Sequence, residues 1–233
     1  MPDASSFSLQ PSSSDSWRLW QLIDSAFPTG GFAHSGGVEA AWQHGLIRDG
    51  DDLAGIVSAG IRQAARSAGP VVLAVLADPG DFARRDRAFD ATVTNHVANR
   101  ASRAQGRAVL NAAADAFDLP EARSAAGAVR RGESPGHLPA AFGLACAGLR
   151  VPPPAAAQAY LFAVARGLIS AAVRLGAVGP MEGQRLQALA AQDANAHAGV
   201  CLTTSADDIA QSAPFLDLLQ ASQDRLYSRL FQS

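Results

Sequence analysis

The sequence predicts an all-α protein, a single-domain bundle of roughly eight to ten helices. Hydrophobic residues make up 48% of the 233 residues and aromatic residues only 6%, so the core has to be built mainly from Ala, Leu and Val. Alanine loses least on entering a helix, and apolar residues recur at helical spacing wherever a pattern can be counted. No convincing alternation of β-branched and aromatic residues indicates a strand. The Pro/Gly clusters that break the chain are short, as helix connections within one domain are, and lie at residues 27–37, 78–81, 132–139, 152–154 and 176–180.

The chain begins with a Ser-rich stretch, residues 1–16 (MPDASSFSLQPSSSDS), which contains no apolar run and no basic residue. We expect this stretch to be a disordered tail, and it lacks the features of a secretory signal. The helical domain is expected to span residues 17–233. Its first segment, SWRLWQLIDSAF, carries apolar residues in a mixed pattern that suits a buried helix better than a strand.

Two further helices are predicted from apolar stripes. The first is opened by Asp49 or Asp51 as its cap, and its apolar or small residues follow a 3.6-residue period at Leu53, Ile56, Val57, Gly60, Ile61, Ala64 and Ala65. The second runs from about Thr94 to Phe117, with the inward positions Ala98, Ala101, Ala108, Ala112 and Ala116. On another face of that helix, Arg100, Arg103 and Arg107 are aligned at i, i+3 and i+7.

The last third of the chain predicts two more helices. One follows the prolines of VPPP, which favour a helix start, and its stripe comprises Leu161, Val164, Ala165, Leu168, Ala172 and Leu175. Gly176 and Gly179 can end it. The other begins near Pro214 and is expected to continue to Leu230.

The charge of the chain limits its partners. A formal net charge of −2 argues against a nucleic-acid binder that depends on phosphate neutralisation. Basic residues concentrate in residues 81–150, which hold 10 Arg against 7 acids, so an acidic partner is most expected there. All 19 basic residues are Arg, which excludes a lysine Schiff base and a P-loop lysine.

Cysteine usage and hydropathy indicate a soluble, cytoplasmic protein. Cys146 and Cys201 are 55 residues apart with apolar neighbours, which favours reduced core thiols. The longest apolar runs are AGPVVLAVLA, which is too short to span a bilayer, and residues 161–179, which two arginines interrupt. We therefore expect no membrane contact.

The stretch AFPTGGFAHSGGVEAA, residues 26–41, has three interpretations. Two of its glycines have the spacing of a phosphate-binding P-loop, but Gly37 occupies the position of the lysine. Ser35 lies in a near match to the nucleophile turn of serine hydrolases, which requires a preceding strand; a hydrolase using Ser35 stays as an alternative. The third interpretation makes Ser35 a helix N-cap. Glu39 is then a first-turn carboxylate that favours the helix dipole, or a group held for a partner.

Other candidate sites are few. Asp193, His197 and Cys201 form the only helical-face trio of metal-ligand types, so a helical metal-binding module is a second alternative. The arginine stripe that begins at Arg100 is either a solvated helix face or a surface for the carboxylates of an acidic partner. Because no nucleophile, base and orienting group come together, we predict that the protein is not an enzyme and carries no cofactor.

Five segments resemble a known family. The segment QLIDSAFPTGGFAHSGGVEAA closely resembles the N-terminal signature of the UreF family, the urease accessory proteins that help to load nickel into urease. Similar segments follow in the expected order: SRAQGRAVL, GHLPAAFGLACA, YLFAVARGLISAAVRLGAVG and the closing DRLYSRLFQS. They cover nearly everything after the Ser-rich tail. The chain departs from the resemblance at Gln223 and Asp224, where the family commonly has a His-Glu pair.

The resemblance implies a homodimeric helical scaffold that is not itself an enzyme. Members of the family bind the accessory protein called UreD or UreH, and that complex recruits the GTPase UreG, whose nucleotide cycle drives nickel delivery to apo-urease. The C-terminal segment, residues 214–233, is a docking element in the family. A short amphipathic tail suits that role because its apolar side chains can enter a groove. The partner-binding residues that the resemblance implies are Phe32, Ser35, Glu39, Arg225, Tyr227, Arg229, Leu230 and Phe231.

Overall fold

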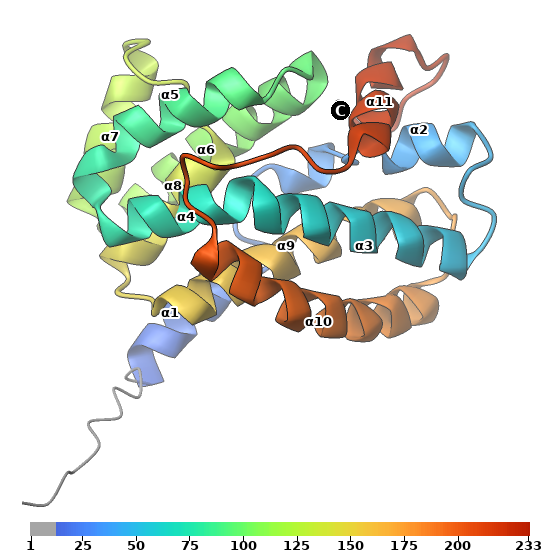
Figure 1. The fold of residues 1–233 in the computed structure, drawn as a ribbon, viewed down its shortest axis with the longest axis horizontal. Helices are drawn as coiled ribbons and strands as arrows, with labels where there is room; N and C mark the ends of the chain where they lie inside the picture. Colours follow the sequence, from blue (N-terminus) through green and yellow to red (C-terminus); the bar gives the residue numbers. More distant parts are fainter. Residues whose placement is uncertain (1–12) are drawn as a thin grey trace, which may run out of the picture.

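The computed structural model describes residues 13–233. The first twelve residues of the expected disordered tail, residues 1–16, lie outside the described part, and the last four form the start of helix α1 (Ser13–Ile23). The described residues contain helices and no strand (Figure 1), so the prediction of an all-α fold is confirmed.

Ten helices of nine residues or more and the six-residue α2 make up the described part of the chain. After α1 they are α2 (Val38–Gln43), α3 (Gly50–Arg66), α4 (Ala68–Ala77), α5 (Phe82–Thr92), α6 (His96–Ala116), α7 (Pro120–Arg130), α8 (Leu138–Gly148), α9 (Pro153–Arg174), α10 (Pro180–Thr203) and α11 (Pro214–Ser222). Short 3-10 turns form at η1 (Gly31–Ala33), η2 (Pro79–Asp81) and η3 (Gln223–Arg225).

Capping side chains and prolines fix where the helices begin. The Asp49 carboxylate accepts hydrogen bonds from the N–H groups of Asp51 and Asp52 at 3.1 and 3.0 Å, so the predicted cap of α3 is Asp49. Asn95 caps α6 in the same way. Proline stands in the first turn of each of the helices α7 to α11, where its missing N–H group has no helical partner to lose.

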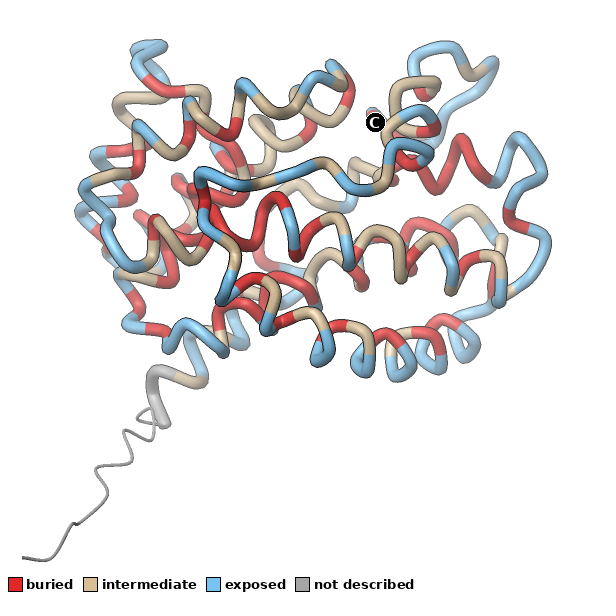
Figure 2. Tube along the Cα trace, viewed as in Figure 1, coloured by how far each residue is buried: buried red, intermediate tan, exposed pale blue. Residues whose placement is uncertain are grey.

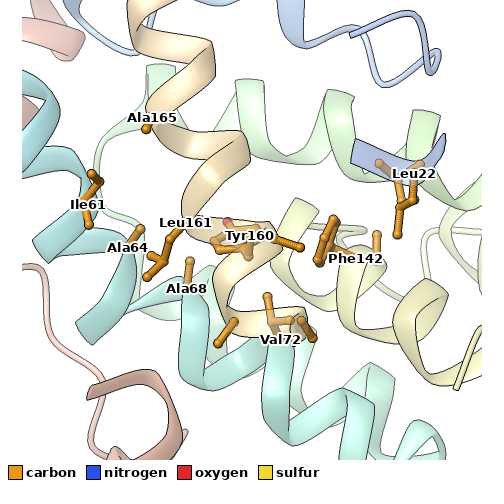
Figure 3. Packing of buried hydrophobic residues seen from close by; sticks show 14 of the residues in the cluster. Leu22, Ile61, Ala64, Ala68, Val72, Phe142, Tyr160, Leu161 and Ala165 are labelled. Carbon is orange, nitrogen blue, oxygen red and sulfur yellow. The ribbon is translucent and has the colours of Figure 1, made fainter. Parts of the chain in front are cut away.

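Helix α9 lies at the centre of the core. It packs against α10, α3 and α4 and also contacts α1, α2 and α8. Figure 3 shows its Tyr160, Leu161 and Ala165 among the buried side chains of neighbouring helices. By length and composition α9 could cross a membrane, but 56% of its most apolar window is buried inside the fold. Packing against other helices accounts for this burial.

Two burial predictions are corrected by the structure. The inward face of α6 is formed by Val97, Ala101, Gly106, Val109, Leu110, Ala113 and Ala114, so only one of the five alanines expected there is buried. Alanine fits either face of a helix, and the bulkier Val and Leu gain more from burial. In α1, Trp17 and Trp20 are 67% and 61% exposed, although the segment was expected to be a buried helix.

The C-terminal helix is shorter than predicted. Helix α11 ends at Ser222, and the chain leaves η3 in an extended conformation at Leu226, so it is not helical up to Leu230. Figure 1 shows α11 beside α2 at one end of the molecule, with the end of the chain close to both. The N-terminal and C-terminal signatures therefore meet in space.

Candidate partner-binding site

The Pro/Gly turn before α2 brings the chain close to α11. Helix α2 begins after Gly37, which has a φ of 94° and caps the helix without a side chain. A Cβ atom at Gly37 would lie 3.2 Å from the backbone nitrogen of Gln220 in α11, so glycine serves both the left-handed conformation and the close approach. The expected cap, Ser35, makes no hydrogen bond through its buried Oγ, and that prediction was wrong.

The C-terminal segment runs back along α2 toward this turn. Gln43 Nε2, at the end of α2, donates to the carbonyl of Ser228 at 2.8 Å. Near the start of α2, Glu39 binds the next part of the segment, and in the turn Ala33 accepts a hydrogen bond from the N–H of Gln232 at 2.8 Å. The turn with α2, residues 28–43, and the non-helical C-terminal segment, residues 226–233, therefore form one structural unit, which we call the turn–tail unit.

Glu39 is the central anchor of the turn–tail unit. Its carboxylate is 1% exposed and accepts from the backbone N–H groups of Leu230 at 2.6 Å and Phe231 at 3.1 Å. The side-chain amide of Gln223, also fully buried, donates to the same carboxylate. A buried carboxylate is tolerated only when donors replace its hydration, and charge-assisted hydrogen bonds supply this at Glu39. These bonds engage the N–H groups of Leu230 and Phe231, which the sequence predicted to be at the end of a helix.

Further contacts hold the last residues of the C-terminal segment. Arg174, in the last turn of α9, donates to the carbonyl of Phe32 and lies over the ring of Phe231, 4.6 Å from its centroid. The His34 ring lies 2.6 Å from the hydroxyl of Ser233, and burial together with the charge of Arg100 lowers the pKa of His34. The turn–tail unit is thus fixed to the central core helix as well as to α2.

Asp224 anchors the start of the segment to α6. Arg100 binds its carboxylate through both terminal nitrogens, at 2.9 and 3.2 Å, and Arg229 binds it at 3.1 Å. His96 lies 3.3 Å from the same carboxylate. The hydrogen bond and charge of Arg100, with a smaller contribution from His96, lower the pKa of Asp224, so the carboxylate is ionised at neutral pH.

The predicted partner-binding residues all belong to this region but divide into two groups. The exposed group is Phe32, Arg225, Tyr227, Arg229 and Leu230; the ring of Phe32 is 75% exposed, and Tyr227 is fully exposed. The buried group is Ser35, Glu39 and Phe231, each no more than 3% exposed. Figure 2 shows the contrast between the buried α2 and the mostly exposed chain that follows α11. Phe231, which was expected to enter a groove on a partner, packs inside this chain.

Neither catalytic nor metal alternative has the geometry it needs. Ser35 is 1% exposed, it follows no strand, and the neighbouring His34 ring is occupied by Ser233. The Cys201 thiol is buried, which raises its pKa to about 11, and the His197 ring bonds to the backbone carbonyl of Asp193. Among residues 13–233, no group of three or more His, Cys, Asp and Glu side chains could hold a metal ion.

A buried polar cluster between α5, α6 and α8 was not predicted from the sequence. The fully buried Asp86 carboxylate accepts from Ser134 Oγ and from the N–H groups of Gly136 and His137. The His137 ring lies 2.8 Å from Asp90 and 3.1 Å from Ser102. These bonds satisfy the N–H groups of the two residues that lead into α8, and Ser102 Oγ accepts from the N–H of Leu138 in its first turn, which has no helical partner. Ser102, the His137 ring and Asp90 are linked by hydrogen bonds in the manner of a Ser-His-Asp triad, but here these side chains hold the start of α8 in the core.

Together, the fold and the site define an all-α protein whose candidate nucleophile and metal ligands are structural and whose candidate site is the exposed surface of the turn–tail unit. The chain belongs to the UreF family of urease accessory proteins, whose family model matches residues 47–191. It is 35% identical over 222 residues to urease accessory protein F of Arabidopsis thaliana, covering 93% of this chain and 92% of the relative.

Bacterial relatives have similar identity. Urease accessory protein UreF of Paenarthrobacter aurescens is 33% identical over 215 residues, which cover 92% of this chain and 96% of the relative. UreF of Granulibacter bethesdensis is 34% identical over 223 residues, with 93% of each chain covered. Along the sequence, the region that the family model matches, residues 47–191, falls between the two parts of the turn–tail unit and includes neither of them.

Proposed function

We propose that this chain is a non-enzymatic, cytoplasmic scaffold for the maturation of urease. As a homodimer it binds a UreD/UreH-type accessory protein, and the complex recruits a UreG-type GTPase and supports GTP-dependent insertion of nickel into apo-urease. Nickel is the cargo of this assembly and not a cofactor of the chain.

One observation carries the proposal: a urease accessory protein presents an ordered chain segment with exposed apolar side chains. Phe32, Tyr227 and Leu230 leave large apolar surfaces in water, and such surfaces near a polar rim are typical of protein interfaces. Arg225 and Arg229 supply the charged rim. The buried contacts of Glu39 and Phe231 hold the segment in one conformation before docking, which lowers the entropy lost on binding.

Co-purification tests this proposal. The chain, a UreD/UreH-type protein and a UreG-type GTPase are expressed together with apo-urease, and the complex and the urease activity are measured. We expect the three accessory proteins to purify together, and Tyr227→Ala with Leu230→Ala to weaken the complex and the activation in parallel.

The control is a double variant on helix α10. Met181 and Leu189 on α10 are 70% and 58% exposed, so Met181→Ala with Leu189→Ala removes a similar amount of exposed apolar surface away from the turn–tail unit. No stable complex of the wild-type proteins would contradict the scaffold function. Equal losses in the two double variants would contradict the assignment of the docking surface.

A further inference from the structure

A basic groove lies along α6, beside the turn–tail unit. It has a volume of about 410 Å³, and its lining includes His96, Asn99, Arg100, Arg103 and Arg107. We call it the arginine groove. The three arginines stand at i, i+3 and i+7, so they follow one side of the helix over about 10 Å at a rise of about 1.5 Å per residue.

The arginines are engaged to different degrees. Arg100 holds Asp224 with both terminal nitrogens. Arg103 uses its Nε to donate to the carbonyl of Pro135 at 3.3 Å, and its terminal nitrogens make no hydrogen bond within residues 13–233. The Arg107 guanidinium has neither a hydrogen bond nor an ion pair to any described residue, and Arg107 is exposed. Each guanidinium carries five N–H donors in a planar arrangement that matches the two oxygens of a carboxylate.

The charges that face the groove leave it positive. Arg100, Arg103 and Arg107 line it, and Arg229 reaches Asp224 from the C-terminal segment. Two carboxylates lie close to them: Asp224 and Asp90. Hydrogen bonds from His137 and Asn99, with a smaller contribution from the charge of Arg103, outweigh burial and lower the pKa of Asp90. Four guanidinium groups against two carboxylates attract further negative charge.

We propose that the arginine groove binds a carboxylate-rich segment of a protein partner, with Asp224 occupying the first of its carboxylate positions from within the chain. Asp224 demonstrates the mode of binding, because Arg100 grips it in the two-pronged geometry that arginine prefers for carboxylates. An extended segment places alternate side chains on one face about 6.6 Å apart. Arg103 and Arg107 are separated by about 6 Å along the helix axis, so two acids at i and i+2 match them.

Protein is favoured over nucleic acid as the occupant. Binding of nucleic acid relies on neutralising many phosphates, whereas this groove is one short basic site on a chain of net charge −2. The groove also adjoins the turn–tail unit through Asp224 and Arg229. A protein that docks there has the groove within reach, although binding of an acidic peptide does not depend on the urease role.

A labelled peptide tests the proposal directly. Fluorescence anisotropy measures binding of a fluorescein-labelled (Glu-Ala)5 peptide to the full chain, with (Gln-Ala)5 and a ten-nucleotide oligo(dT) as comparison probes. We expect the acidic peptide alone to bind, and Arg103→Gln with Arg107→Gln to weaken it at least about fivefold, as for the loss of two exposed charge pairs. Asp224→Asn frees Arg100 and is expected to tighten binding about two- to fivefold.

Arg185→Gln is the matched control, since Arg185 is an exposed arginine on α10 with no ion pair among the described residues. Absence of peptide binding to the wild-type chain would overturn the proposal. So would an equal loss in Arg185→Gln, a failure of Asp224→Asn to tighten binding, or oligo(dT) binding as tightly as the peptide through the same two arginines. None of these results bears on co-purification with the urease accessory proteins.

Discussion

Replacement of Glu39 by alanine is expected to release the C-terminal segment while the helical bundle stays folded. The change removes the acceptor for three donors: the N–H groups of Leu230 and Phe231 and the amide of Gln223. A buried donor left without a partner costs about 1–3 kcal/mol. Since the segment can detach and bind water instead, the lower value applies to each donor, and the segment loses about 3 kcal/mol of anchoring.

Hydrogen exchange measures this loss where it occurs. A change of about 3 kcal/mol is roughly a 100-fold shift in the opening equilibrium, so the amides of Leu230 and Phe231 should exchange roughly 100-fold faster in Glu39→Ala. The amides of α9 should keep their protection, because the hydrogen bonds of the Glu39 carboxylate go to Gln223, Leu230 and Phe231 and not to α9. Glu39→Gln should recover little, since its amide group turns N–H donors toward a site that already holds donors.

Glu182→Ala is the control, because Glu182 is an exposed carboxylate on α10. If Leu230 and Phe231 exchange at the wild-type rate in Glu39→Ala, the carboxylate does not hold the segment and the reasoning fails. Faster exchange throughout the chain would show that Glu39 supports the whole fold and not the segment.

Three further predictions concern the same region and the core beneath it. Deletion of residues 226–233 should abolish docking of the UreD/UreH-type partner and cost at least about 2 kcal/mol through lost aromatic burial, with the helical circular dichroism spectrum retained; loss of that spectrum would contradict it. Asp224→Asn should lower the free energy of unfolding by no more than about 1 kcal/mol. The pair with Arg100 lowers the pKa of Asp224, so the stability difference between wild type and Asp224→Asn should be constant above the ordinary pKa of about 3.9. The difference should vanish as the pH falls through the lowered pKa. Urea titrations at pH 7, 5 and 3 measure it, and a difference that grows in acid would refute the prediction. Gly106→Ala should cost about 1–3 kcal/mol in urea unfolding, since a Cβ there would overlap the backbone at the start of α8, whereas Gly199→Ala, which points into open space, should be neutral or stabilising; equal effects would refute the close approach.

The fold class was predictable because the helical signals are local. The Asp49 cap and the stripe of α3 are written in consecutive residues, and five of the seven predicted stripe positions of that helix are buried. The inward face of α6 was mispredicted because the expected stripe consisted of alanines, which gain less from burial than valine and leucine do. The buried Val97, Val109 and Leu110 form a stripe at helical spacing that faces α8 and the core.

The candidate site was predictable only in part for a similar reason. The resemblance to the family pointed to both segments, but not to the fact that they touch. The bonds from Glu39 to Leu230 and Phe231 join residues 191 and 192 positions apart. A sequence pattern cannot distinguish a carboxylate that faces a partner from one that faces its own chain. The acidic anchor of α8, Asp86, left no signal at all, because its donors lie 48 to 51 residues away.

We propose that the turn–tail unit is the surface that meets the UreD/UreH-type partner. Hydrogen exchange of the full chain with and without that partner tests it most directly. We expect the partner to slow exchange in residues 31–33 and 226–231 and to leave the exposed face of α10 unchanged. Unchanged exchange in both segments while the complex is formed, or protection confined to α10, would contradict it.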